Sequence, residues 1–199
     1  MIFHEYKWNT SNNNVLLTFD DGPIPESTPL ILAALDKLKI KAAFFCVGNN
    51  IEKNQSLAKE ILSCGHMIGN HTYNHKIITR LDKSAAVDEI KSFIRLTEDK
   101  LDYRPKFFRP PHGKFNLSTN KILTELDQTA VMWSLLTCDY KNNLELVKLT
   151  VTKFLKRNSI VVLHDSLKSK EIILDSINII IEHLDKNGFE IGEPAECLK

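Results

Sequence analysis

The chain has 199 residues, of which 43% are hydrophobic and 26% charged, a composition typical of one globular domain. Lysine and arginine (26) balance aspartate and glutamate (25), so the net charge of +1 leaves no basic excess to grip phosphate backbones and we expect no nucleic-acid partner. No apolar run approaches the roughly 20 residues that a membrane-spanning helix needs, so we expect no membrane span.

The amino-terminal stretch and the cysteines bear on location. Residues 1–7 carry no apolar core of a signal peptide, so the cytoplasm is the default expectation, while a processed or fused form stays open. The four cysteines lie far apart, at positions 46, 64, 138 and 197, with no CxxC spacing. We therefore expect reduced, structural thiols rather than a disulfide framework.

Short apolar runs alternate with helical patterns along the whole chain. In chain order the predicted elements are strand 15–19, helix 27–39, strand 42–47, helix 56–64, strand 66–69, helix 82–101, strand 106–109, a helix from 118, strand 130–134, helix 144–157, strand 160–163, helix 170–186 and strand 189–191.

The strands are apolar on both faces, which favours parallel strands covered by helices, as in an α/β fold. An open doubly wound sheet and a barrel both remain possible, since about seven units is one short of the usual eight-fold barrel. In either architecture the functional site lies at the carboxyl ends of the strands.

Chemically capable side chains gather at those strand ends. They are Asp20 and Asp21, His71 and His75, Arg109 and His112, Asp139, and His164. Asp20-Asp21-Gly22 taken alone has the chemistry of a turn. Trp133, inside a predicted strand, is interpreted as a core residue.

The spacing of His71 and His75 suggests a metal site. Four residues apart on a helical turn, both rings would lie on one face, although the pattern alone is a weak signal. Two histidines and one carboxylate leave coordination positions open, as in catalytic metal sites. His164, across the same mouth, is then a candidate general acid, although a lone histidine there is more often structural.

Five segments in order resemble the motifs of the polysaccharide deacetylases, the NodB-homology family 4 carbohydrate esterases. They are Thr18 to Gly22, His71 to His75, Arg109 to Gly113, Trp133 to Tyr140, and Leu163 to Asp165. The resemblance implies a single domain over 1–199 with a motif-bearing core at about 15–192. It also implies a distorted (β/α) barrel of about seven units.

The resemblance further implies a metal-dependent hydrolase that removes N-acetyl or O-acetyl groups from an acetylated sugar polymer, oligosaccharide or glycoconjugate. One divalent ion, zinc or alternatively cobalt, nickel or manganese, is the implied cofactor, and the sequence indicates no protein partner. Hydrolysis of a different amide, such as deformylation, and a catalytically inactive carbohydrate-binding relative are the alternatives.

The resemblance assigns roles residue by residue. Asp21, His71 and His75 would hold the metal ion. Asp20 would be the base, held by Arg109, and His164 the acid, oriented by Asp139. The backbone N–H of His112 would stabilise the oxyanion, and Pro110, Tyr140 and Leu163 would shape the substrate pocket, with Leu163 against the acetyl methyl.

Three positions depart from the family pattern. His112 replaces the usual tyrosine of the third motif, Tyr140 replaces a tryptophan of the fourth, and Leu136 replaces an aspartate. Because the implied metal ligands, base and acid are all retained, these departures bear on substrate preference more than on catalysis.

Overall fold

The computed structural model describes residues 6–199, so the first five residues of the predicted domain and of the amino-terminal stretch lie outside it. Its strands are Leu16–Asp20 (β1), Ala43–Cys46 (β2), Met67–Asn70 (β3), Phe107–Phe108 (β4), Thr129–Ala130 (β5), Leu135–Leu136 (β6) and Ile160–His164 (β7). Its α-helices are Thr28–Leu38 (α1), Gly48–Lys53 (α2), Gln55–Ser63 (α3), Lys83–Leu101 (α4), Leu117–Glu125 (α5), Leu144–Phe154 (α6), Ile173–Asn187 (α7) and Pro194–Cys197 (α8).

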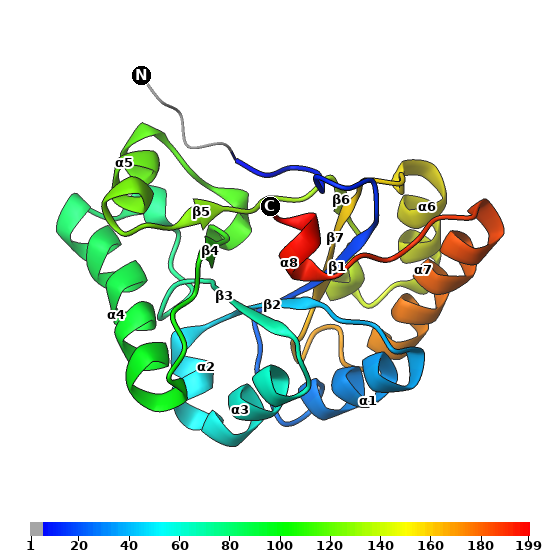
Figure 1. Ribbon diagram of the computed structural model, residues 1–199, viewed down its shortest axis with the longest axis horizontal. Helices are drawn as coiled ribbons and strands as arrows, with labels where there is room; N and C mark the ends of the chain where they lie inside the picture. The colour runs from blue at the N-terminus through cyan, green and yellow to red at the C-terminus, as the bar shows by residue number, and fades with distance from the viewer. Residues whose placement is uncertain (1–5) are drawn as a thin grey trace.

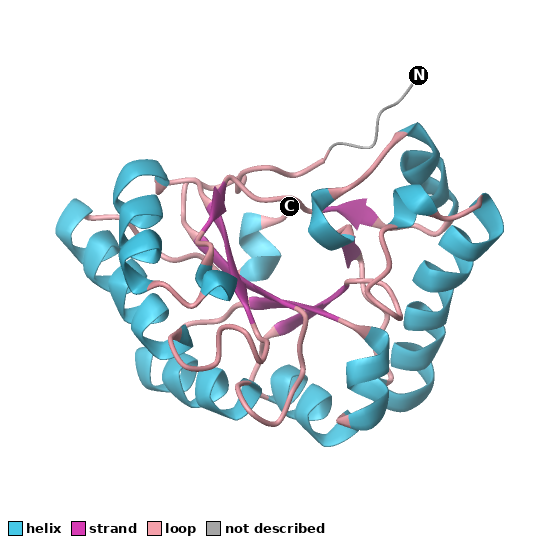
Figure 2. Ribbon diagram, turned by 180° about the vertical axis from the view of Figure 1, so that it is seen from behind, coloured by secondary structure: helices cyan, strands magenta, loops and turns pink. Residues whose placement is uncertain are grey.

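The seven strands form one parallel sheet in the order β5-β4-β3-β2-β1-β7-β6. Figures 1 and 2 show that the sheet curls and that the larger helices surround it on the outside. The predicted barrel-like α/β fold is thereby confirmed. Among residues 6–199, no helix is both long and apolar enough to cross a membrane.

The two edge strands, β5 and β6, do not pair with each other, and the amino-terminal segment runs along that side. Lys7 forms a parallel bridge with Val131, and Asn9 forms an antiparallel bridge with Ser159. The barrel is therefore distorted, because backbone from the start of the described chain takes the place of a closing strand pair.

The main apolar core lies between the central strands and the outer helices. It contains Phe19 and Phe44, whose rings stack with centroids 5.0 Å apart, together with apolar side chains of α1, α6 and α7. Burial on both faces explains the uninterrupted apolar runs in the sequence. The packed core holds the strands in register, so that their carboxyl ends meet at one mouth.

Three expectations about the elements were wrong. Helix α2 was missed, because Gly48, Asn49 and Asn50 are poor helix formers and no side chain caps its start. Of the predicted strand 130–134 only Ala130 lies in a strand, at the end of β5, because the chain then crosses to the other sheet edge, where β6 begins at Leu135. The predicted strand 189–191 is reduced to a single bridge between Ile191 and Val15.

Candidate active site

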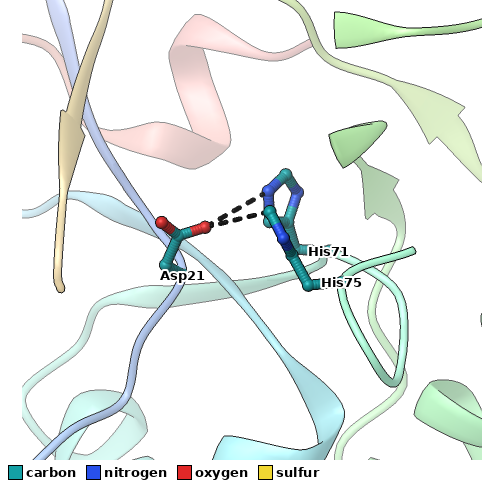
Figure 3. Close-up of side chains that lie close together, drawn as sticks. All are labelled: Asp21, His71 and His75. Atoms are coloured by element: carbon teal, nitrogen blue, oxygen red, sulfur yellow. Dashed lines mark ion pairs between the residues drawn. The ribbon is translucent and has the colours of Figure 1, made fainter. Parts of the chain in front are cut away.

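Asp21, His71 and His75 come together at the mouth of the sheet (Figure 3). Oδ1 of Asp21 lies 3.7 Å from Nε2 of His71 and 3.2 Å from Nε2 of His75. One potential ligand atom from each of the three side chains lies within 4.8 Å of those of the other two. Two imidazole nitrogens and one carboxylate oxygen are a donor set used for catalytic zinc, so these residues could hold a divalent ion.

The tautomer and charge of His71 suit a ligand. Its Nδ1–H donates to the carbonyl of Arg109 at 2.7 Å, which leaves a lone pair on Nε2, the nitrogen that faces Asp21. Burial lowers the pKa of His71 to about 4 despite the opposing charges of Asp20 and Asp21, so the ring is neutral at pH 7.

Asp21 is held ready as an anion. Burial alone would raise its pKa, but the hydrogen bond from His75 and the positive charges that His71 and His164 carry when protonated outweigh that effect. The carboxyl pKa therefore lies below its ordinary value, and the group is ionised at neutral pH. A neutral imidazole and an ionised carboxylate are the protonation states in which these side chains bind metals.

The histidine loop is not the helical turn that the spacing predicted. Residues 71–75 lie in a loop, and Thr72 and His75 have positive φ angles of 64° and 57°. The rings nevertheless lie 5.0 Å apart, because the loop folds back after β3. The pairing of the two histidines was predicted correctly, and the local structure that produces it was not.

The turn that carries Asp21 depends on a close approach at Gly22. Asp21 itself has a φ of 82°. A β-carbon added at Gly22 would lie 2.0 Å from Oδ2 of Asp165, so only glycine leaves room for that carboxylate. Asp165 accepts hydrogen bonds from the hydroxyls of Ser27 and Thr28, yet burial raises its pKa to about 6.

Asp20 and Arg109 form a buried ion pair beside the metal-ligand cluster. Arg109 is fully buried, and its Nη1 donates to Oδ1 of Asp20 at 2.7 Å and to the hydroxyl of Thr18 at 2.7 Å. The same guanidinium donates to the carbonyls of Val131 (3.0 Å) and Met132 (2.9 Å). Arg109 donates to Oδ1 of Asp20, so Oδ2 is left available to accept a proton.

Across the mouth, His164 is paired with Asp139. Oδ1 of Asp139 accepts from Nδ1–H of His164 at 2.7 Å, and Oδ2 accepts from its backbone N–H at 2.7 Å. Burial would lower the pKa of His164, but the hydrogen bond and charge of Asp139 outweigh it and the pKa is raised. The pairing orients Nε2 as the free proton-donating position.

A cavity of about 310 Å³ joins these groups. It is lined by Asp20, Asp21, His71, His75, His112, Trp133, Leu136, Tyr140, Val162, His164 and Lys168. The ring of His112 lies 5.0 Å from that of His75, and the ring of Tyr140 lies 5.0 Å from that of His164. A carboxylate and a protonatable imidazole therefore face one space that also touches the metal-ligand cluster.

Two predicted pocket residues lie elsewhere. Leu163 is fully buried in the core, because side chains alternate along β7 and its neighbour Val162 shares the face of His164. Pro110 is buried and does not line the cavity. Val162 could have been found from the alternation rule, which places the residue two before His164 beside it.

Other lining residues were not assigned from the sequence. Trp133 was interpreted as core, but it is only partly buried and faces the cavity. Lys168 follows β7 in a loop and carries no sequence signal of its own. Together these residues add an aromatic surface and a cation to the predicted set.

Comparisons with known proteins agree with this geometry. The sequence pattern of the family "polysaccharide deacetylase" matches residues 7–131. The chain is 32% identical to a peptidoglycan-N-acetylglucosamine deacetylase of Bacillus cereus, over 96% of this chain and 92% of the relative. A second Bacillus cereus protein of the same name is 43% identical over 64% of this chain. This chain spans only 46% of the length of that relative.

Solved structures give the same picture. The peptidoglycan N-acetylglucosamine deacetylase Bc1960, in complex with an N-hydroxybenzamide, matches with a TM-score of 0.91 and 30% identity, covering 96% of this chain and 92% of that one. A family 4 pseudoenzyme from Bacillus anthracis matches with a TM-score of 0.88 and 25% identity, covering 100% and 70%. Structural likeness alone therefore does not separate active from inactive relatives.

Proposed function

The chain belongs to the polysaccharide deacetylase family, and we propose that it is a metal-dependent hydrolase that removes acetyl groups from N-acetylglucosamine units of a glycan. The coarser activity, deacetylation of acetylated sugar polymers, is that of its family. The peptidoglycan N-acetylglucosamine deacetylases among its relatives make peptidoglycan the first substrate to test. One observation carries the proposal: base, acid and ligand trio all border a single cavity.

The ion is proposed to be zinc, held by Asp21, His71 and His75. The convergence of two imidazole nitrogens, that of His71 on a neutral ring, on an ionised carboxylate supports that assignment. When bound, a divalent ion supplies Lewis acidity, which polarises an acyl carbonyl and makes water a stronger acid.

The proton transfers are assigned to side chains of this chain. Asp20, fixed by Arg109, accepts a proton from the attacking water through its free carboxylate oxygen. Nε2–H of His164 then donates a proton to the leaving nitrogen, because an amine departs poorly as an anion. The carbon–nitrogen bond breaks, and the products are acetate and a free amino group on the sugar.

The walls of the cavity suit a sugar ring with a small acyl group. Leu136 and Val162 offer apolar surface for the acetyl methyl, and Tyr140 and Trp133 offer aromatic faces for the ring. The backbone N–H of His112 is proposed as an oxyanion donor, a role in which the side chain can differ from the usual tyrosine.

The test is an acetate-release assay on peptidoglycan, chito-oligosaccharides and acetylxylan, with metal content measured on the same samples. We expect about one divalent ion per chain, release of acetate and loss of activity on chelation. Asp20→Asn should abolish turnover and keep the ion, with exposed Asp88→Asn as a control that retains both. Activity that survives chelation would refute the metal-dependent mechanism, and release of formate from an N-formylated sugar, with no acetate from the acetylated substrates, would favour the deformylase alternative.

Metal binding and sugar binding without release of any acyl group would instead indicate an inactive carbohydrate-binding relative. Loss of the ion in Asp20→Asn would show that base and ligand are assigned the wrong way round.

A further inference from the structure

Glu89 is a buried charge that the proposed reaction does not use. It lies in helix α4, outside the cavity, and it is the one charged residue among the buried positions of that helix. Its side chain is only 6% exposed. Burying an ionised carboxylate is costly unless hydrogen-bond donors satisfy it, so its partners indicate what it does.

Those partners belong to the loop between the two metal-ligand histidines. Oε2 of Glu89 accepts from the backbone N–H of Asn74 at 2.8 Å, and Oε1 accepts from Nδ2 of the same residue at 2.9 Å. The backbone carbonyl of Glu89 accepts from the N–H of Tyr73 at 3.0 Å. Nζ of Lys76, the residue after His75, lies 3.5 Å from Oε1.

The loop needs such support because its backbone is unfavourable. Thr72 and His75 both have positive φ angles, a conformation that is unfavourable for residues other than glycine and persists only where surrounding contacts enforce it. Asn70 fixes the first half, since its Oδ1 accepts from the N–H of Thr72 at 2.9 Å and its Nδ2 donates to the carbonyl of Ile90 at 3.1 Å. Glu89 fixes the second half, directly before His75.

We propose that Glu89 is a positioning residue for the metal site: through Asn74 it holds the loop so that the imidazole of His75 faces Asp21, and it thereby sets the affinity for the ion without touching it. The inference rests on the proposed metal site at Asp21, His71 and His75. Hydrogen-bonded groups behind metal ligands are typically worth about 10- to 100-fold in metal affinity.

Two single substitutions separate positioning from charge. In Glu89→Gln the amide oxygen can accept from the N–H of Asn74, and the amide nitrogen can donate to Oδ1 of Asn74 once that side chain rotates by half a turn. We expect zinc affinity within about threefold of wild type, although a negative charge has been removed. Glu89→Ala removes both hydrogen bonds, and we expect zinc to bind about 10- to 100-fold more weakly.

The measurement is a zinc titration of the folded protein against a competing chelator, together with the visible spectrum of the cobalt-loaded protein. Asp88→Ala, an exposed carboxylate on the same helix, is the charge control and should bind as wild type. Ile94→Ala, on the buried side of α4, is the stability control: it should lower the melting temperature of the metal-free protein and leave zinc affinity unchanged. Only Glu89→Ala should also change the cobalt spectrum.

A second pair of variants decides the case if Glu89→Ala does not fold. Asn74→Asp sets two carboxylates against each other, so positioning predicts weaker zinc binding, whereas added negative charge alone predicts stronger binding. The double variant Asn74→Asp/Glu89→Gln restores a donor–acceptor pair at the wild-type net charge, and zinc affinity should recover to within about threefold of wild type.

Several results would overturn the proposal: Glu89→Ala binding zinc as tightly as wild type, Glu89→Gln weakening zinc binding as much as Glu89→Ala, or no recovery in the double variant. Failure of the wild-type protein itself to bind zinc would refute the proposed metal site rather than the role of Glu89.

Discussion

Replacing Arg109 by methionine tests the buried ion pair on which Asp20 depends. The side chain of Arg109 is fully buried and makes four hydrogen bonds, to Asp20, Thr18, Val131 and Met132, while its guanidinium lies 4.0 Å from the ring centre of Phe45. Methionine fills much of the same volume but offers no donor. Arg109→Met therefore leaves the carboxylate of Asp20 buried without its partner.

The expected loss follows from that unpaired charge. Removing one partner of a buried ion pair costs about 3–5 kcal/mol, which is a large part of the roughly 5–15 kcal/mol that stabilises a domain. In Arg109→Met/Asp20→Asn the remaining group is a neutral amide, which is less costly to bury. We therefore expect the double variant to be more stable than Arg109→Met, with a coupling energy of about 1–3 kcal/mol.

Equilibrium unfolding in urea measures both quantities. The midpoint should fall in Arg109→Met and recover partly in the double variant, with an unchanged slope against urea concentration. Acetate release should be absent from both, so stability and not activity is the informative measurement. A loss below about 1 kcal/mol in Arg109→Met, or additive losses in the double variant, would refute the idea that the guanidinium compensates the buried carboxylate of Asp20.

Two further predictions concern histidines. Burial, with the charge of Lys41, lowers the pKa of His66 to about 4, and its Nδ1 accepts from the N–H of Ala42 at 3.2 Å, so protonation favours the unfolded chain. The stabilisation that neutral His66 contributes is complete above about pH 6.5 and is lost as the pH falls toward 4. His66→Gln should remove up to about 3 kcal/mol of this acid-dependent fall in the free energy of unfolding. The same slope of unfolding free energy against pH in wild type and His66→Gln, measured by urea unfolding, would contradict the prediction. Asp139 raises the pKa of His164, so in Asp139→Asn the imidazole should lose its proton at lower pH. We expect kcat to fall by about 10²- to 10⁴-fold and the alkaline limb of the pH–rate profile to move to lower pH. An unmoved limb would exclude His164 as the acid.

Much of the site could be predicted because its chemistry is concentrated at strand ends. The apolar runs located most of the strands, and the rule that parallel strands end at one mouth brought Asp21, His71 and His164 together. The prediction that failed concerned the direction in which a side chain points, not the position of its strand. Leu163 was placed in the pocket, whereas alternation along β7 directs it into the core and directs Val162 to the cavity.

Other features depend on contacts between segments far apart in the sequence. The carboxylate of Asp165 against Gly22 joins two loops more than 140 residues apart, and no local pattern shows why glycine is required there. Glu89 reads as one more charge on an amphipathic helix, because its hydrogen bonds to Asn74 form only once α4 packs beside the histidine loop. Such partners become visible only when the fold is known.

The backbone that carries the metal-ligand cluster has unfavourable angles, which contacts from the rest of the fold must enforce. Asp21, Thr72, His75 and His112 all have positive φ angles, and all lie in the segments that follow β1, β3 and β4. Each conformation costs free energy, so each must be enforced by contacts that the rest of the fold supplies. For Asp21, the contact comes from the carboxylate of Asp165, which packs against Gly22 and accepts from the hydroxyl of Thr28 in α1. For His75, it comes from the carboxylate of Glu89 in α4, which accepts from the backbone N–H of Asn74. The helix layer therefore does more than cover the sheet, because it fixes the geometry in which two imidazoles and a carboxylate face one another.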